Sequence, residues 1–176
     1  MFFQKEIVGG KIILRPYYMD DISAWQKWDI DSGIQKYMPE QQTEPMSAEE
    51  QIGYLKECEI DQTGAYWSIV WKENKKLIGT ISLTDINKYH GIAELGIVVG
   101  ETDYWGMGVA TEAIKLVLEF VVRQIGLRRV VAEYEEGNLA MGKMLEGVGF
   151  NLECVCKSSR IKKGTPINTI RYYILI

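Results

Sequence analysis

The chain is poor in the residues that build metal centres and disulfide frameworks. It has one histidine, His90, and three cysteines, Cys58, Cys154 and Cys156. Cys154 and Cys156 are two residues apart, which places them on one face of a strand, and no cysteine pair has zinc-ligand spacing. We therefore expect no metal site, no disulfide framework and a reducing, cytoplasmic compartment.

Long apolar runs and a basic excess are also missing. No run approaches the ~20 apolar residues that a membrane span needs, and the first residues lack the features of a secretory signal. The formal net charge is −4, whereas nucleic-acid binders usually carry a basic face. One basic cluster (Lys157, Arg160, Lys162 and Lys163) is more typical of a solvated hairpin loop. We expect neither a membrane nor a nucleic-acid partner.

The residues that are present suit one folded domain over residues 1–176. Of these residues 47% are hydrophobic and 25% are charged, an ordinary globular balance. No repeat, low-complexity stretch or flexible linker divides the sequence. The pattern indicates neither a monomer nor a homodimer, and both stay open.

Periodicity predicts an α/β (α+β) fold. Predicted strands are Lys11–Arg15, Tyr66–Trp71, Leu77–Leu83, Ile92–Val99, Arg129–Glu133, Phe150–Lys157 and Asn168–Ile176. Predicted helices begin at Asp20 or Asp21, after the capping box Ser47–Glu50, at Gly108 (running to Ile125) and at Asn138. The strand–helix–strand unit from Ile92 to Glu133 should be a parallel crossover between antiparallel hairpins. We expect a mixed, mostly antiparallel sheet of about seven strands with helices on both faces.

One loop carries most of the chemical information. The strand Ile92–Val99 leads into a loop with Gly106 and Gly108, which opens the long helix. The first turn of a helix has unpaired backbone N–H groups and the positive end of the dipole, so it is a ready anion site. Glycines and the small Ala110 allow a phosphate to approach the backbone closely. The loop is predicted to hold a phosphate or pyrophosphate.

The same loop fits other phosphate-binding motifs less well. The Gly-x4-Gly-Lys-Ser/Thr pattern is absent. A dinucleotide fingerprint needs a third glycine where Thr111 stands, and six residues separate the strand end from Gly106. Glu133 nevertheless sits where such folds place a ribose-binding acid. A NAD-dependent oxidoreductase therefore stays open as an alternative.

The loop resembles the coenzyme A loop of the GNAT superfamily of N-acetyltransferases, Gln/Arg-x-x-Gly-x-Gly/Ala. The match is Trp105–Ala110, with Trp105 in place of Gln or Arg. The longer string Tyr104–Ala113 is similar to the ribosomal-protein acetyltransferase (RimJ/RimL-like) branch. Leu14-Arg15-Pro16, Asn138 and Gly149-Phe150 fit the same branch in the same order.

The resemblance implies a GNAT-like single domain with a splayed central parallel pair of strands. It implies an enzyme that transfers an acetyl group from acetyl-CoA to a primary amine, borne by a protein N-terminus or a small molecule. Backbone groups of the loop would bind the pyrophosphate: Trp105, Gly106, Met107, Gly108, Val109, Ala110 and Thr111. The strand residues Ile97, Val98 and Val99 would contact the pantetheine arm, one of their N–H groups would polarise the thioester carbonyl, and Asn138 would contact the coenzyme.

Glu94 is the candidate general base. An amine attacks only when neutral, so a base must take its proton, often through water. The alternative is a paired or solvated strand glutamate. Where many relatives have a tyrosine general acid this chain has Leu145, and Met141 replaces the serine more usual in the branch. A catalytically silent coenzyme A-binding module therefore also stays open.

The acceptor side is the least defined by sequence. Trp28, Tyr37 and Trp67 are candidate substrate-binding residues, although aromatic side chains at such spacings also build cores. Asn168 stands where the branch often shows Asp, which puts recognition of a protein N-terminus in doubt.

Overall fold

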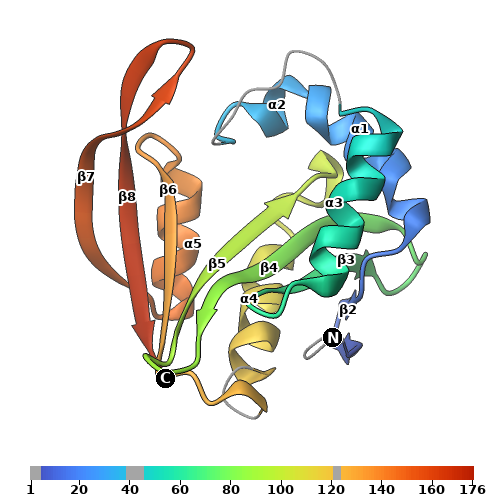
Figure 1. Cartoon of the computed structure of the whole chain (residues 1–176), viewed down its shortest axis with the longest axis horizontal. Coiled ribbons are helices and arrows are strands. Elements are labelled where there is room, and N and C mark those ends of the chain that lie inside the picture. Colours follow the sequence, from blue (N-terminus) through green and yellow to red (C-terminus); the bar gives the residue numbers. More distant parts are fainter. Residues whose placement is uncertain (1–4, 39–45, 121–123) are drawn as a thin grey trace.

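The computed structural model describes residues 5–38, 46–120 and 124–176. Eight strands in this part of the chain form one sheet: β1 Ile7–Val8, β2 Ile12–Arg15, β3 Ala65–Trp71, β4 Leu77–Asn87, β5 Ile92–Val99, β6 Arg129–Glu135, β7 Asn151–Lys162 and β8 Thr165–Leu175. The α-helices are α1 Ile22–Ile30, α2 Ser32–Gln35, α3 Ala48–Ile60, α4 Val109–Phe120 and α5 Leu139–Val148. Figure 1 shows their arrangement.

The sheet is mixed and mostly antiparallel, as predicted. Its strand order is β1-β2-β3-β4-β5-β6-β8-β7, and among the strands described only β5 and β6 run parallel. The strand beyond the expected seven is β1, which pairs with Ile13 and Leu14 of β2. With two residues, β1 is too short for a period of two to be visible in the sequence.

The parallel pair separates soon after it begins. β5 pairs with β6 only over Ile92–Glu94, opposite Arg129–Val131. Beyond that point β5 stays paired with β4 as far as Val99, while β6 stays paired with β8. The two strands therefore form a V, which Figure 1 shows between the labels β5 and β6. One edge of β5 is left without a strand partner.

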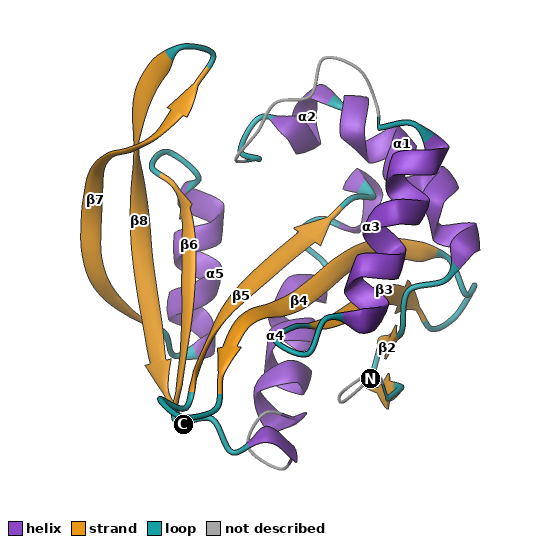
Figure 2. Cartoon of the chain, in the orientation of Figure 1, coloured by secondary structure: helices purple, strands orange, loops and turns teal. Residues whose placement is uncertain are grey.

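Helices cover both faces of the sheet. α1, α2 and α3 lie on one side of β4 and β5, and α4 lies on the other (Figure 2). The amphipathic helix α4 buries Val109, Ala113, Ile114 and Val117 in the main core. A second hydrophobic cluster joins α1, α2 and α3 through residues such as Trp25, and Val98 of β5 packs against it. Because side chains alternate along a strand, the side chains of Val98 and its neighbour Ile97 lie on opposite faces of the sheet.

Local signals placed several helix boundaries correctly. The Ser47 side chain accepts from Glu50 N–H while Glu50 reaches back to Ser47 N–H, so the predicted capping box is confirmed. Asn138 caps α5 through a bond from Met141 N–H at 3.3 Å. The expected last residues of the Gly108 helix fall partly on residues 121–123, outside the described residues.

The C-terminal hairpin is longer than predicted. β7 and β8 extend to Lys162 and Thr165, so part of the basic cluster lies within a strand. Arg160 and Lys162 of that cluster form ion pairs with Glu133 and Glu135 of β6. The hairpin therefore pairs two of its cations with acidic side chains of β6. Among the described helices, none is long and apolar enough to cross a membrane.

Candidate functional site

The start of α4 presents unpaired backbone amides. The first hydrogen bond of the helix runs from Glu112 N–H to the Gly108 carbonyl at 3.0 Å. The amides of Val109, Ala110 and Thr111 come before that bond, so they have no acceptor within the helix. Together with the helix dipole they form a site suited to an anion.

The two loop glycines keep this site open. Gly106 and Gly108 have φ values of +75° and +81°, a region that residues with a Cβ rarely adopt. A Cβ built at either position meets no other atom within 4 Å. The space above the backbone is therefore free, so an anion can approach the amides of the helix start.

Two hydrogen bonds fix the loop to the sheet. The Trp105 indole N–H donates to the Val99 carbonyl at 2.8 Å. The Lys11 ammonium donates to the Met107 carbonyl at 3.0 Å. Trp105, which stands in the Gln or Arg position of the family motif, thus ties the loop to the end of β5.

A cavity of about 710 Å³ joins this loop to the open edge of β5. All residues predicted to bind the coenzyme line it except Met107, namely Ile97, Val98, Val99, Trp105, Gly106, Gly108, Val109, Ala110, Thr111 and Asn138. The Met107 side chain is exposed and its N–H donates to the Tyr104 carbonyl at 3.4 Å. Tyr37, a predicted substrate-binding residue, also lines this cavity.

The backbone of β5 alternates between the cleft and β4. Gly100 N–H donates to Ile78 of β4, whereas the Val99 carbonyl accepts from Trp105 on the cleft side. In an antiparallel pair the direction of the backbone groups alternates from residue to residue. Ile97 and Val99 therefore present N–H and C=O groups to the cleft, while those of Val98 face Thr80 on β4. Val98 contributes its side chain to the cavity, not the predicted backbone contact.

Glu94 stands where the parallel strands separate. It is half-buried and lies opposite Thr84 on β4 and Val131 on β6. Burial raises the pKa of Glu94, the charge of Glu133 adds to this, and Arg171 acts against it. A carboxylate with a raised pKa is a stronger base, which suits proton removal from an amine. No ion-pair partner of Glu94 is present among the described residues.

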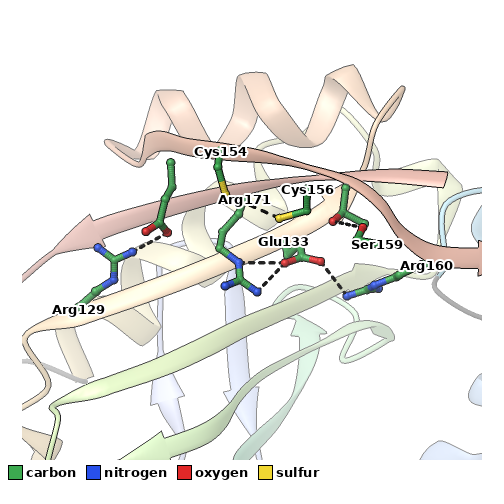
Figure 3. Close-up of polar contacts among 9 residues, drawn as sticks. Arg129, Glu133, Cys154, Cys156, Ser159, Arg160 and Arg171 are labelled. Carbon is green, nitrogen blue, oxygen red and sulfur yellow. Dashed lines mark hydrogen bonds and ion pairs between the residues drawn. The ribbon is translucent and has the colours of Figure 1, made fainter.

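Glu133, unlike Glu94, is paired with arginine side chains. Its carboxylate accepts from Arg171 Nε at 2.9 Å and from Arg160 Nη2 at 3.3 Å (Figure 3). Burial opposes ionisation of Glu133, but hydrogen bonds from Thr169 and Arg171 outweigh it and lower the pKa. Glu133 is thus a paired, ionised carboxylate beside Glu94. Its oxygens are occupied by arginines, which removes the ribose-binding role considered for a dinucleotide site.

A second cavity of about 240 Å³ adjoins the first. Ile34, Met38 and Val98 line both cavities. Trp28, predicted to bind substrate, lines this second cavity, and its indole N–H donates to Glu101 at 3.1 Å. Its walls come from α1, α2, α3 and the strands β4 and β5.

The prediction for Trp67 is wrong. Trp67 has no exposed surface, packs against Phe120 of α4 and donates its indole N–H to the Lys5 carbonyl at 3.1 Å. It lines neither cavity. Its position in the inner strand β3 makes it a core residue.

Sequence reasoning missed several residues around Glu133 and in the second cavity. Arg171 and Arg160 surround Glu133, and Asp29, Gln35 and Gln51 line the second cavity. None lies in a motif, because helices and strands distant in sequence bring them together. The scattered residues also form no metal centre: in the described part of the chain, no three His, Cys, Asp or Glu side chains are grouped to hold an ion.

Known proteins share this sequence pattern and this fold. The family described as "Acetyltransferase (GNAT) domain" matches residues 11–151. The chain therefore belongs to the GNAT acetyltransferase family. This family membership and the mixed sheet, which differs from a doubly wound parallel sheet, leave no support for the oxidoreductase alternative.

Individual relatives cover nearly the whole chain. It is 25% identical over 166 residues to an uncharacterized N-acetyltransferase, p20, from Bacillus licheniformis, which spans 94% of this chain and 93% of the relative. It is 25% identical over 161 residues to spermidine N(1)-acetyltransferase from Escherichia coli K12, spanning 92% and 84%. A solved structure of spermidine N-acetyltransferase from Vibrio cholerae in complex with CoA and spermine has a TM-score of 0.84 at 21% identity, covering 95% and 96%.

Proposed function

We propose that the chain transfers an acetyl group from acetyl-CoA to a primary amine. The observation that carries this proposal is the 710 Å³ cavity, which joins the free amides of α4 to the unpaired edge of β5. A ligand with a diphosphate at one end and an extended amide-containing arm matches both parts. Family membership supports the same cosubstrate.

In this proposal, the residues that line the large cavity have the following roles. The amides of Val109, Ala110 and Thr111 bind the diphosphate, and Gly106 and Gly108 allow its approach. The backbone groups of Ile97 and Val99 pair with the amides of the pantetheine arm, and one of these N–H groups stabilises charge developing on the thioester oxygen. The Asn138 side chain, whose oxygen caps α5, has its amide N–H₂ left to donate to the coenzyme.

Glu94 acts as the general base in this proposal. It takes a proton from the attacking amine, directly or through water, while the new C–N bond forms and the C–S bond breaks. The leaving thiolate takes its proton from water. Leu145, which replaces the tyrosine of many relatives, is apolar and has no exposed surface, so it supplies no proton.

The acceptor belongs to the class of primary amines, and the relatives favour a small molecule. Two of them are spermidine acetyltransferases by name. A protein N-terminus, the acceptor implied by the RimJ/RimL-like branch, is the second candidate within the same chemistry. Whether this chain belongs to that branch stays a prediction.

A thiol-release assay tests the proposal. Purified protein is mixed with acetyl-CoA and a panel containing polyamines, aminoglycosides, amino sugars, amino acids and peptides with free N-termini. We expect amine-dependent release of free thiol, with the acetylated amine identified by mass spectrometry. Tight binding of acetyl-CoA with no turnover on any amine would instead support the silent binding module.

A further inference from the structure

Three buried polar atoms in the second cavity have no hydrogen-bond partner among the described residues. They are Trp25 Nε1, Gln35 Oε1 and Gln51 Oε1, and all three residues line that cavity. The side chains come from α1, α2 and α3 respectively and are at most 8% exposed. Leaving a buried polar atom without a hydrogen-bond partner destabilises the fold. Three such atoms in one small cavity indicate a binding site for a polar ligand.

The orientation of the two glutamine amides is fixed by their other contacts. Gln35 Nε2 donates to the Trp28 carbonyl at 3.2 Å, and Gln51 Nε2 donates to the Asp29 carboxylate at 2.9 Å. Both partners can only accept, so the amide nitrogens must face them. The two oxygens are therefore left as acceptors toward the cavity, where a ligand with N–H donors would satisfy them.

The charge of the cavity points in the same direction. Among the described residues that line it, Asp29 is the only one with a formal charge. The remaining wall is mainly apolar and aromatic, with Tyr17, Trp25, Trp28 and Tyr54. Aromatic faces attract cations, and a carboxylate with nearby amide oxygens provides acceptors for an ammonium group.

The cavity also lies on the correct side of the sheet for an acceptor. Its strand residues Thr80 and Val98 face α1 and α3. Glu94 has the same parity as Val98, so its side chain is on the same face, roughly 13 Å along β5 at ~3.3 Å per residue. A molecule with one end at Glu94 and the other between the helices would lie along this face.

We propose that the cavity between α1, α2 and α3 binds a second, protonated amino group of the acceptor, so that the substrate is a linear aliphatic diamine or polyamine. The inference rests on the proposed function, because it places the reacting amine at Glu94. Gln35, Gln51 and Asp29 accept from the distal ammonium group, and the aromatic rings surround its carbon chain. Trp25 Nε1 donates to an oxygen that accompanies the ligand, such as a water of hydration.

The test compares linear diamines of increasing length with monoamines of the same length. For the best diamine we expect kcat/KM to exceed that of its matched monoamine by about 10-fold or more, the factor for hydrogen bonds to a charged group. In Gln51→Met or Asp29→Asn this ratio should fall toward one. The control Gln62→Met changes an exposed glutamine outside the cavity and should keep the ratio.

Calorimetry of the same amines without acetyl-CoA separates this inference from the proposed function. If no amine is acetylated but the wild-type chain binds the diamine more tightly than the monoamine and Gln51→Met does not, the cavity assignment stands and the enzymatic assignment fails. If amines are acetylated with equal efficiency whether or not they carry a distal ammonium, or if Gln51→Met keeps the difference, the cavity assignment is overturned. Thermal melting of each variant confirms that it is folded.

Discussion

The two walls of the cleft differ in the chemical groups that they present to a ligand. One wall presents backbone groups and the other presents side chains. The coenzyme wall, where we propose that acetyl-CoA binds, presents backbone groups: amides at the start of α4 and alternate groups of β5. The acceptor wall, where we propose that the amine binds, is the second cavity and presents side chains from α1, α2 and α3, with Asp29, Gln35 and Gln51 brought together by packing. A site made of backbone groups constrains the sequence in only one way: its residues must leave the backbone accessible. Glycines in a fixed pattern meet this requirement. A side-chain site can be made by many combinations.

Glu94 lies where β5 and β6 separate, and the removal of this proposed base should have the largest effect. Glu94→Gln keeps the size of the side chain but cannot accept the amine proton, so kcat/KM should fall by about 10²- to 10⁴-fold. Steady-state kinetics measures this loss, and calorimetry should show unchanged acetyl-CoA affinity. The control Glu59→Gln alters an exposed carboxylate at the end of α3. A Glu94→Gln variant as active as this control would remove Glu94 from catalysis.

Gly108→Ala should damage the coenzyme wall while leaving the acceptor wall intact. A methyl group would occupy the space above the backbone, at a φ of +81° that strains an L-residue. We expect acetyl-CoA affinity measured by calorimetry to fall by about 10-fold or more.

The matched control for this change is Gly126→Ala. Gly126 has a φ of +73° and equally open surroundings, but it lies beyond α4 and away from the loop. Both variants should lose about 1–2 kcal/mol of stability from the strained backbone. Equal acetyl-CoA affinity in the two variants would show that the Gly108 space does not hold the coenzyme.

Trp105→Phe should have a smaller effect on the same wall. It keeps an aromatic ring but removes the N–H that donates to the Val99 carbonyl at 2.8 Å. A single neutral hydrogen bond contributes about 0.5–1.5 kcal/mol, so acetyl-CoA affinity should fall by about 3-fold. Trp71→Phe, which changes a tryptophan outside both cavities, is the reference variant. An affinity unchanged relative to that reference would mean that this bond does not position the loop.

The pH dependence of the reaction should report the environment of Glu94. The base works only when ionised, so kcat/KM should rise with pH through a pKa above the ordinary glutamate value. Arg171 lowers the pKa of Glu94, so Arg171→Met should move this acidic limb to higher pH. A limb that stays in place in Arg171→Met, or that persists in Glu94→Gln, would assign the titration to another group.

The difference between the two walls also explains which parts of the site could be predicted from the sequence. The strand–loop–helix at Ile92–Phe120 was predictable, because period-two and helical patterns flank two glycines and each fixes a local conformation. The splayed parallel pair followed only from the family resemblance. Its position at Glu94 was not predicted, since no local signal tells where a parallel pair separates. Trp67 was misassigned because an aromatic residue in a buried strand and one in a pocket have the same pattern.

The acceptor wall was beyond reach for a related reason. Gln35 and Gln51 lie on different helices, and an isolated glutamine in a helix reads as a surface residue. Their burial results from the packing of α1, α2 and α3 against β4 and β5, which no local window contains. Arg171 and Arg160 meet Glu133 only because β7 and β8 pair beside β6.

The most direct test of the account is a crystal structure of the chain with coenzyme A. We expect density for the diphosphate within hydrogen-bonding distance of the Val109, Ala110 and Thr111 amides. The pantetheine arm should run along the cleft edge of Ile97 and Val99, with its thiol toward Glu94. Coenzyme A bound elsewhere on the surface, or no binding at saturating concentration, would contradict it.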